Sequence, residues 1–428
     1  MDLRYTEAEE AFRAGLRRWL AEVVPTLGPK PSSLDWAGRR RYDTAWQRRL
    51  YDAGYAGLDW PVEGGGRGAS PVEQLIFLEE LELAHAPYVG VNFVGLLHAG
   101  PTVIVEGTPE QRARFLPPIL RGEEVWCQGF SEPGAGSDLA SLRTRAVRDG
   151  DEYVVTGQKI WTSHAEVADF CELLVRTGPE DSRHRGISWL ILPMDSPGIE
   201  FRPLRTIAGS TEFGELFLDG VRVPVANRVG DENDGWRVTM TTLSFERGTA
   251  FVGEALQSME LLRAYRDLAR RTGAWEDGEI RRRLGHLGAE LDALWALARR
   301  NVSQAARTGV PGIGGSVFKL ALSELRQRIA QLGTELAGPA SLVWDDLPGF
   351  RTDGTYGAGT PVPGDVVASD DDVAERTAGG DGVVGEGPVG NGVVVGTWVH
   401  SFSRTIAAGT SQIQRNIIAE RILGLPKG

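Results

Sequence analysis

The sequence predicts a mostly helical protein with a small β domain inserted between two helical regions. Hydrophobic residues recur at helical spacing near both ends of the chain, whereas 124–236 holds short apolar runs with a period of two between glycine-containing turns. A chain of 428 residues is too long for one ordinary core. We therefore expect a helical domain at 1–123, a barrel-like or sandwich β domain at 124–236 and a four-helix bundle at 237–428.

The composition is typical of a water-soluble globular protein, with 24% charged and 41% hydrophobic residues. The formal net charge of −12 argues against a nucleic-acid surface and against an anionic membrane. Cys127 and Cys171 lie in apolar runs without metal-ligand spacing, so we expect buried thiols and no metal site. No signal-peptide pattern and no membrane-spanning apolar run is present, which predicts a cytoplasmic protein.

Capping patterns mark the helices of the first region. Thr6 begins a capping box ahead of an apolar helical face. Ser70-Pro71 and Thr108-Pro109 each place a proline at the first helical position. His85 and His98 have no accompanying nucleophile or metal ligand, so we interpret them as packing or surface histidines. This region is expected to supply scaffold and no chemistry of its own.

Seven short runs are expected to form the strands of the β domain, namely 125–130, 142–147, 153–156, 172–175, 187–193, 201–204 and 215–223. Asp149-Gly150, Pro197-Gly198 and Asp219-Gly220 have the composition of hairpin turns.

The stretch Phe130-Ser131-Glu132-Pro133-Gly134-Ala135-Gly136-Ser137-Asp138 predicts a sharp loop with unobstructed backbone N–H groups. Such a loop cradles a phosphate or a polar ring edge, although a plain turn is the alternative. Trp161 follows in Lys159-Ile160-Trp161-Thr162-Ser163. Because Gln158-Lys159 before it are expected to be exposed and two hydroxyl residues follow, Trp161 is well placed to stack on a planar ring; the alternative is a core tryptophan.

Together these two segments resemble the acyl-CoA dehydrogenase family of flavoenzymes. The resemblance extends from the N-terminal helices to 412–421, with a gap at about 353–396. It implies FAD as cofactor, with Trp161 against the flavin, Ser163 hydrogen-bonded near its N5 atom, and Ser137 also touching the pantetheine arm of the substrate. The residues that match the family's cofactor-binding pattern are Phe130, Ser131, Gly136, Ser137, Trp161, Thr162, Ser163, Thr410 and Gln412.

The same resemblance implies removal of an α-proton and a β-hydride from an acyl thioester, which needs a carboxylate base. Family members carry the base either just before the Gly-Thr that starts the last helix or in a Glu-Arg pair on the first helix of the C-terminal domain. The first position is Ala408 here, and the second is Glu246-Arg247. Glu246 is therefore the expected base, with a solvated helix residue as the alternative.

Three further residues are expected to bind the substrate. Arg247 would line the substrate channel or orient the base, although a simple ion pair is the alternative. The backbone N–H groups near Ala408 and Gly409 are, by resemblance, the donors that polarise the thioester carbonyl.

Near-heptad spacing supports the predicted bundle, on the residues Ile280, Leu284, Leu287, Leu291, Leu294, Leu322, Leu325, Ile329 and Leu332. A closing helix is expected at 411–423, capped by Thr410 and stopped by Gly424 and Pro426. By resemblance the bundle would associate with further copies into a homodimer or homotetramer.

Two stretches depart from the family pattern. Many relatives have an Arg-x-x-Phe-Gly motif that reaches the adenine end of a neighbouring subunit's FAD, and it is absent from Arg270-Arg271-Thr272-Gly273-Ala274-Trp275. The later glycine-rich partner contact is altered to Glu335-Leu336-Ala337-Gly338-Pro339. The segment 353–396 is rich in Gly, Val and Asp, which favours a flexible surface insertion over a substrate lid or docking element.

These observations predict an FAD-dependent α,β-dehydrogenase of acyl-CoA thioesters that passes electrons to an electron-transfer flavoprotein. One alternative acts on an acyl group bound to a carrier protein, in a biosynthetic pathway. A second is a subunit that completes a partner's flavin site in a hetero-oligomer, and a third is an oxygen-using flavin oxidase. A base on the first bundle helix is a hint of branched or bulky acyl groups, but the sequence does not specify the acyl group.

Overall fold

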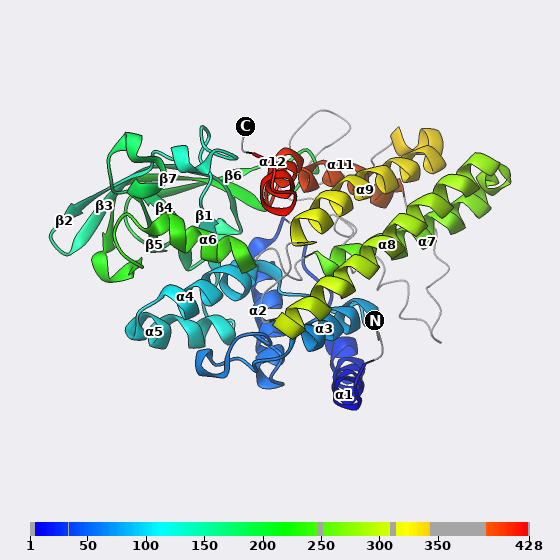
Figure 1. Cartoon of the computed structure of the whole chain (residues 1–428), viewed down its shortest axis with the longest axis horizontal. Coiled ribbons are helices and arrows are strands. Elements are labelled where there is room, and N and C mark those ends of the chain that lie inside the picture. The colour runs from blue at the N-terminus through cyan, green and yellow to red at the C-terminus, as the bar shows by residue number, and fades with distance from the viewer. Residues whose placement is uncertain (1–4, 33, 246–250, 309–313, 343–390, 427–428) are drawn as a thin grey trace.

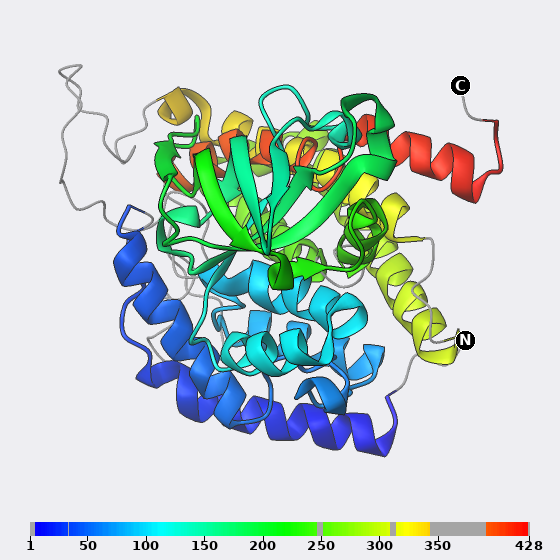
Figure 2. The same ribbon diagram turned by 90° about the vertical axis from the view of Figure 1, so that its left-hand side faces the viewer.

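The computed structural model describes residues 5–32, 34–245, 251–308, 314–342 and 391–426 (Figure 1). Helices, then a sheet, then helices follow one another along the chain, which confirms the predicted fold class. In Figure 2 the strands stand above the helices of the N-terminal domain. No helix within these ranges is long and apolar enough to cross a membrane.

The N-terminal domain contains α1 (Glu7–Val23), α2 (Trp36–Asp52), α3 (Pro71–Leu83), α4 (Gly100–Glu106) and α5 (Pro109–Leu120). The capping boxes predicted at Thr6, Ser70 and Thr108 are all present. Helix α2 was not predicted from the sequence. Its buried face mixes Trp46 and Leu50 with the polar Asp43 and Gln47, so the apolar periodicity that identifies a helix is broken.

The middle domain is an eight-stranded sheet built from β1 (Trp126–Gly129), β2 (Arg145–Asp149), β3 (Glu152–Ser163), β4 (Phe170–Arg176), β5 (Ile187–Pro193), β6 (Ile199–Leu204), β7 (Phe213–Pro224) and β8 (Arg228–Val229). The strand order is β6-β7-β3-β2-β4-β5-β8, and β1 pairs with β4 in parallel.

Two details differ from the expected strands. Asp219-Gly220 is not a hairpin turn, because it lies inside β7 where the pairing with β3 shifts between Val155 and Gly157. Strand β3 also continues through Ser163, so Trp161 belongs to a strand.

The C-terminal region contains α6 (Gly235–Phe245), α7 (Val252–Thr272), α8 (Gly278–Thr308), α9 (Gly314–Ala337), α11 (Asn391–Arg404) and α12 (Ser411–Ile417). Helices α7, α8, α9 and α11 pack together, and eight of the nine predicted core residues are buried there, while Ile280 is partly buried. Helix α6 packs on β5 and on α4, and α3 contacts α7 and α8 (Figure 1). The two helical domains therefore touch each other as well as the sheet.

The insertion expected at 353–396 extends too far. Its last residues, 391–396, form the beginning of α11, and Val394 is fully buried in the bundle core. An apolar Val-Val-Val run in a glycine-rich context gave no helical period. The rest of the expected insertion, 353–390, lies outside the described residues.

The closing helix follows its prediction. Thr410 caps α12, a π-helical turn at Ile418–Ile422 continues it, and Gly424 with φ of +67° follows its end.

Candidate active site

The glycine-rich loop is anchored by a buried ion pair. The Glu132 carboxylate accepts hydrogen bonds from the amides of Arg143 (2.7 Å) and Thr144 (2.8 Å) and from Lys159 Nζ (2.8 Å). Lys159 Nζ also donates to the carbonyl of Phe130 at 3.1 Å. The expected exposure of Lys159 is therefore wrong: its side chain is fully buried because its partner lies on a distant loop, which local sequence does not reveal.

The electrostatics of this pair follow from its burial. Desolvation works against the charge of Glu132, but the Lys159 ammonium and the hydrogen bonds from Lys159, Thr144 and Arg143 outweigh it and hold the pKa of Glu132 below its usual range. Burial lowers the pKa of Lys159, and Glu132 opposes that shift. The pair fixes the start of the loop to strand β3.

The loop itself uses some of its N–H groups internally. The amides of Glu132 and Ala135 donate to each other's carbonyls at 3.0 Å. A Cβ atom added at Gly134 or Gly136 would meet nothing within 4 Å, so both border open space. Gly136 and Ser137 are exposed and form the open end of the loop. The prediction of unobstructed amides is thus right for this end only.

Phe130 and Ser131 lie on the closed side of the loop. Phe130 is only 4% exposed and packs in the large core that the N-terminal and middle domains share. Ser131 is half-buried, and its carbonyl accepts the amide of Ile160 at 3.0 Å. The loop and the Trp161 segment are therefore held side by side.

Trp161 is displayed outward by an irregularity in β3. The pairing with β7 shifts between Lys159 and Thr162, and Trp161 has a φ of +62°. Its indole is 56% exposed and touches the edge of Phe213 at a centroid distance of 5.8 Å. A left-handed backbone costs a bulky residue roughly 1–3 kcal/mol and is typically held at functional sites.

The two residues after Trp161 differ in access. Thr162 is fully buried, and its Oγ1 has no hydrogen-bond partner among the described residues. Thr162 thus lies behind the surface on which Trp161 is exposed, paired with Gly214 in the sheet. Ser163 is half-buried and pairs with Phe213 in the sheet.

His164 comes next and was not singled out from the sequence. Its ring packs on Trp36 and Phe93 at centroid distances of 4.8 and 5.9 Å. Burial, with Arg39 acting in the same direction, lowers the pKa of His164 to about 3, so the ring is neutral.

The loop between α11 and α12 has two consecutive left-handed residues. Ala408 has a φ of +50° and Gly409 a φ of +82°. Among the described residues, no acceptor takes a hydrogen bond from the amide of either one. Thr410 caps α12 by accepting the amide of Ile413 at 3.2 Å, and Gln412 is exposed. The loop thus offers a pair of unused N–H donors, which is the group expected to polarise a carbonyl.

The expected base and its neighbour, Glu246 and Arg247, lie in 246–250, outside the described residues. The helix that leads to them is firmly placed. On α6, Thr242 shares a 2.9 Å hydrogen bond with Thr102, and Arg237 pairs with Glu106 at 2.6 Å.

A buried polar cluster joins the π-helical turn at Gly95–Ala99 to strands β1 and β4. His98 is 7% exposed, on a π-helical turn at Gly95–Ala99, and its Nδ1 lies 3.6 Å from Glu172 Oε1. Gln128 Nε2 donates to the same oxygen at 2.7 Å. His98 is therefore a packing histidine, as expected, with a carboxylate partner that the sequence did not indicate.

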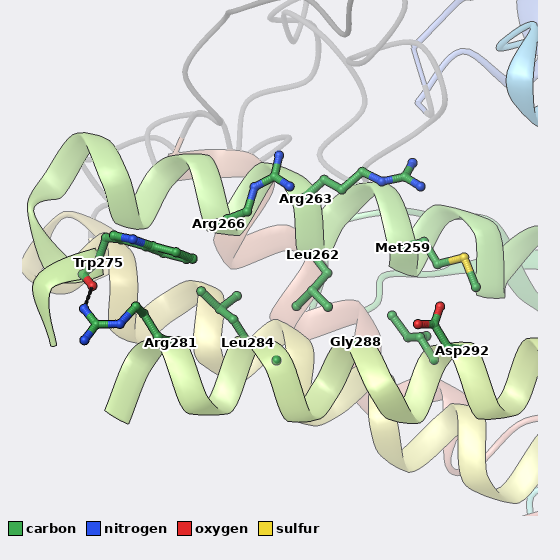
Figure 3. Close-up of a pocket in the computed structure, with 11 residues that line it drawn as sticks. Met259, Leu262, Arg263, Arg266, Trp275, Arg281, Leu284, Gly288 and Asp292 are labelled. Carbon is green, nitrogen blue, oxygen red and sulfur yellow. Dashed lines mark hydrogen bonds between the residues drawn. The ribbon is translucent and has the colours of Figure 1, made fainter. Parts of the chain in front are cut away.

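A groove of about 330 Å³ lies between α7 and α8 (Figure 3). Leu262, Leu284 and Trp275 line it, while Arg263 and Arg266 extend from α7 on the side away from α8. The Arg270 guanidinium sits 5.0 Å over the Trp275 ring. This is the region in which the Arg-x-x-Phe-Gly motif is missing.

The β domain displays an exposed tryptophan and a glycine-rich loop with an open end, and it stands between two helical domains in the chain. Sequence models of the acyl-CoA dehydrogenase N-terminal, middle and C-terminal domains match residues 6–123, 127–221 and 233–352. The chain belongs to the acyl-CoA dehydrogenase family.

Similar proteins cover the whole chain. Acyl-CoA dehydrogenase IpdE1 of Mycobacterium tuberculosis is 38% identical over 424 residues, 98% of each chain. Two solved structures each align over 100% of both chains. The ChsE4-ChsE5 complex from Mycobacterium tuberculosis is 32% identical with a TM-score of 0.76, and the Tcur3481-Tcur3483 steroid ACAD is 31% identical with a TM-score of 0.75.

Proposed function

We propose that this acyl-CoA dehydrogenase uses FAD to introduce an α,β double bond into an acyl-CoA thioester, with Glu246 as the catalytic base. The observation that carries the proposal is Trp161, an exposed tryptophan held in a strained backbone, next to Ile160, whose amide bonds to Ser131 of the glycine-rich loop. Exposing an indole and straining its backbone both work against stability, so they point to a ligand that covers the ring.

The residues present fit FAD. The exposed Trp161 face suits a flat ring system, and Ser163 follows it on the same strand. The open amides and hydroxyl at Gly136 and Ser137 suit phosphate oxygens or a polar ring edge. Phe130, Ser131 and Thr162 match the family's cofactor-binding pattern and would shape the site, Phe130 and Thr162 from buried positions. Thr410 and Gln412, at the start of α12, would complete the site from the bundle.

The residues of this chain would act at two places on the substrate, the α-carbon and the thioester oxygen. Glu246 would take the α-proton, while the amides of Ala408 and Gly409 would donate to the thioester oxygen as negative charge develops on it. FAD, when bound, supplies the acceptor for the β-hydride and passes the electrons to an electron-transfer flavoprotein. Arg247 would line the channel beside the base, and Ser137 would hold the pantetheine arm.

Glu246 is preferred over other carboxylates for two reasons. The other family position for the base is Ala408, whose side chain cannot take a proton. Glu254, which contacts the last residue of α11, is occupied by ion pairs with Arg404 (2.6 Å) and Arg326 (3.3 Å).

We infer a bulky substrate from the relatives. The Tcur3481-Tcur3483 structure is named a steroid ACAD and is 31% identical to this chain. A base in the Glu-Arg position agrees with large acyl groups. We therefore expect acyl-CoA thioesters with a polycyclic, steroid-like acyl group to be oxidised faster than short linear ones.

A second candidate is a flavin-sharing subunit of a hetero-oligomer. Two observations favour it: the similar ChsE4-ChsE5 structure is named as a complex, and the motif that reaches a neighbour's FAD is missing from Arg270–Trp275. In that case this chain would supply Glu246 while another chain holds the adenine end of FAD.

The test is an anaerobic reduction of the flavin. Purified protein is mixed with linear, branched and polycyclic acyl-CoAs and with an acyl carrier protein thioester, and absorbance is followed at about 450 nm, the position of oxidised flavin. The variants are Glu246→Gln and, as a matched control, Glu290→Gln, which alters an exposed carboxylate on α8 that pairs with Arg328.

Bleaching by an acyl-CoA in the parent and in Glu290→Gln, with none in Glu246→Gln, is the expected result. Equal bleaching in all three proteins would refute Glu246 as base. If only the carrier-protein thioester bleaches the flavin, the substrate is an acyl group bound to a carrier protein and not an acyl-CoA. Rapid reoxidation in air would indicate an oxidase.

A further inference from the structure

Lys319 lies buried beneath the loop that joins α11 to α12. Its side chain projects from α9 and is 3% exposed. Its Nζ atom donates to the carbonyl of Arg404 at 3.0 Å and to the carbonyl of Gly409 at 2.7 Å. One ammonium group therefore connects the last residue of α11 with the residue that precedes the cap of α12.

The loop between these two carbonyls needs support. Ala408 has a left-handed backbone, which an alanine adopts at a cost, and Gly409 continues it. Gln414 Nε2 donates to the carbonyl of Ala408 at 3.0 Å. Because a trans peptide points its N–H away from its C=O, a carbonyl held inward turns the N–H of the next residue outward. Gln414 therefore turns the amide of Gly409 outward by holding the Ala408 carbonyl, while Lys319 fixes the two ends of the loop through the Arg404 and Gly409 carbonyls. The amides of Ala408 and Gly409 have no protein acceptor among the described residues.

We infer that Lys319 is a positioning residue of the reaction: it holds the α11–α12 loop in the conformation in which the amides of Ala408 and Gly409 meet the thioester carbonyl of the substrate. The inference rests on the proposed function. Lys319 touches neither substrate nor cofactor in this account, and it acts through the two backbone carbonyls.

The charged groups around Lys319 come from three helices. Glu254 of α7 pairs with Arg404 of α11 at 2.6 Å and with Arg326 of α9 at 3.3 Å. His400 of α11 lies 3.1 Å from Arg404, and burial, aided by Arg404 and Arg326, lowers the pKa of His400 to about 3, so it stays neutral. Lys319 thus shares a buried cluster with one carboxylate and two guanidinium groups.

Burial lowers the pKa of Lys319 to about 8; Glu254 opposes this shift and Arg404 adds to it. Below that pH the charged ammonium donates charge-assisted hydrogen bonds to both carbonyls. Above it the amine is neutral and these hydrogen bonds weaken. Carbonyl polarisation is therefore expected to decline as the pH rises through about 8.

The stability of the fold follows the opposite trend. A lysine whose pKa is lowered on folding binds fewer protons in the folded than in the unfolded state between pH 8 and its usual 10.5. The contribution of Lys319 to stability therefore rises with pH across this window. If Lys319 only supported the fold, the rate of flavin reduction would follow stability as the pH rises. If Lys319 positions the amides, the rate falls with rising pH while its contribution to stability rises.

The experiment compares the parent with Lys319→Met, which keeps the side-chain length and removes the donors. Ser323→Ala is the matched control, because Ser323 is buried one turn further along α9 and, among the described residues, its hydroxyl bonds to the Lys319 carbonyl alone. Four quantities are measured. They are the rate of anaerobic flavin reduction at saturating acyl-CoA, the infrared carbonyl stretch of a product enoyl-CoA labelled with ¹³C at C1 and bound to the oxidised enzyme, the flavin content, and the affinity for the thioester.

Lys319→Met is expected to slow flavin reduction roughly 10- to 100-fold, somewhat less than the loss of an oxyanion donor itself. The carbonyl stretch of its bound label should move toward the value in water, while flavin content and thioester affinity stay near those of the parent. Ser323→Ala should match the parent in all four measurements.

A Lys319→Met protein with the parent's rate and carbonyl stretch would overturn the inference and leave the proposed function intact. A parent whose flavin no thioester reduces would overturn both. If Lys319→Met fails to fold, the pH dependence of the parent tests the inference. A carbonyl stretch that moves toward its value in water as the pH rises through about 8 supports the inference. A carbonyl stretch that is constant from about pH 6.5 to about pH 9.5 refutes it.

Discussion

Trp161 combines two features that a structural tryptophan rarely has, an exposed ring and a left-handed backbone. The buried tryptophans of this chain, such as Trp126 and Trp189, are fully enclosed. Trp161 gains little from packing, since the aromatic ring it contacts among the described residues is Phe213, in an edge-to-face arrangement. Its side chain is therefore expected to matter for ligand binding and not for folding.

Replacing Trp161 by alanine should leave the stability of the cofactor-free protein within about 0.5 kcal/mol of the parent, as for most exposed positions. FAD affinity should fall, because the stacking surface is lost. Urea unfolding and fluorescence titration with FAD measure the two effects. As a control, Trp126→Ala removes a fully buried ring and should cost about 3–5 kcal/mol. A Trp161→Ala variant that unfolds as easily as Trp126→Ala would contradict the ligand role.

The Glu132–Lys159 pair makes a prediction with a definite sign of pH dependence. In the parent the pKa of Glu132 lies below its usual range, so its stabilisation is present above the unfolded value of about 4.3 and is lost as the pH falls through the lower folded value. In Lys159→Met the counter-charge is gone, burial then raises the pKa of Glu132, and the slope reverses: stability should increase as the pH is lowered from 8 toward 5.

At neutral pH, Lys159→Met should cost about 3–5 kcal/mol, because it leaves a buried carboxylate without its ion-pair partner. Urea unfolding at several pH values checks both the loss and the slope. The double variant Glu132→Gln/Lys159→Met carries no buried charge at this place, so its slope should disappear. A Lys159→Met protein that still loses stability in acid would show that the pair does not control the loop.

At the scale of elements, short sequence motifs correctly predicted those features, such as helix caps, that depend on neighbouring residues alone. The capping boxes at Thr6, Ser70 and Thr108 were found because all of their atoms lie within four residues. Helix α2 was missed because Asp43 and Gln47 are buried on its inner face by partners from Val91 and Ile119, more than forty residues away. Likewise, nothing near Lys159 in the sequence indicates that Glu132 will bury it.

Helix α6 illustrates how an element can position the base. Gly235, at its first residue, lies so close to β5 that an added Cβ would come within 2.5 Å of the Ser188 backbone. The contact lets α6 lie directly on the sheet while it leads the chain to 246. Because backbone cannot move aside as a flexible side chain can, a methyl group here should displace the helix.

Gly235→Ala is expected to destabilise the protein by roughly 1–3 kcal/mol, the usual cost of overpacking, and to slow flavin reduction at saturating substrate. Gly285→Ala is the matched control, because it lies within α8 and an added Cβ would meet nothing within 4 Å there. That variant should be slightly stabilised, by about 0.5–1 kcal/mol, with an unchanged rate. Equal behaviour of the two variants in thermal unfolding and reduction kinetics would refute this role of α6.

At the scale of the molecule, the residues expected at the flavin site stay a prediction, whereas the sequence did predict the order of the domains, because each carries its own hydrophobic period. It could not predict how the site closes. Among the described residues, no hydrogen bond or ion pair joins Phe130–Ser137 or Trp161–Ser163 to Thr410 and Gln412. Completion of the flavin site from the bundle side therefore remains a proposal that depends on assembly.

The assembly can be tested directly. The missing Arg-x-x-Phe-Gly motif predicts that the chain expressed alone binds less than one FAD per subunit, because the adenine end lacks the usual partner contact. Light scattering and the absorbance ratio of flavin to protein measure mass and occupancy. Full FAD occupancy in a homodimer or homotetramer would exclude the hetero-oligomer candidate.

The parallel pairing of β1 with β4 has a consequence for the order of folding. This pairing joins Trp126 to Phe170, whereas β2 and β3 meet across a two-residue turn. Pairings between distant residues close more slowly than local hairpins. The Phe130–Ser137 loop leaves β1 directly, so it acquires its shape only once this slow closure is complete. FAD would then be captured at the end of folding, and bound flavin would be a signal that the middle domain has finished assembling.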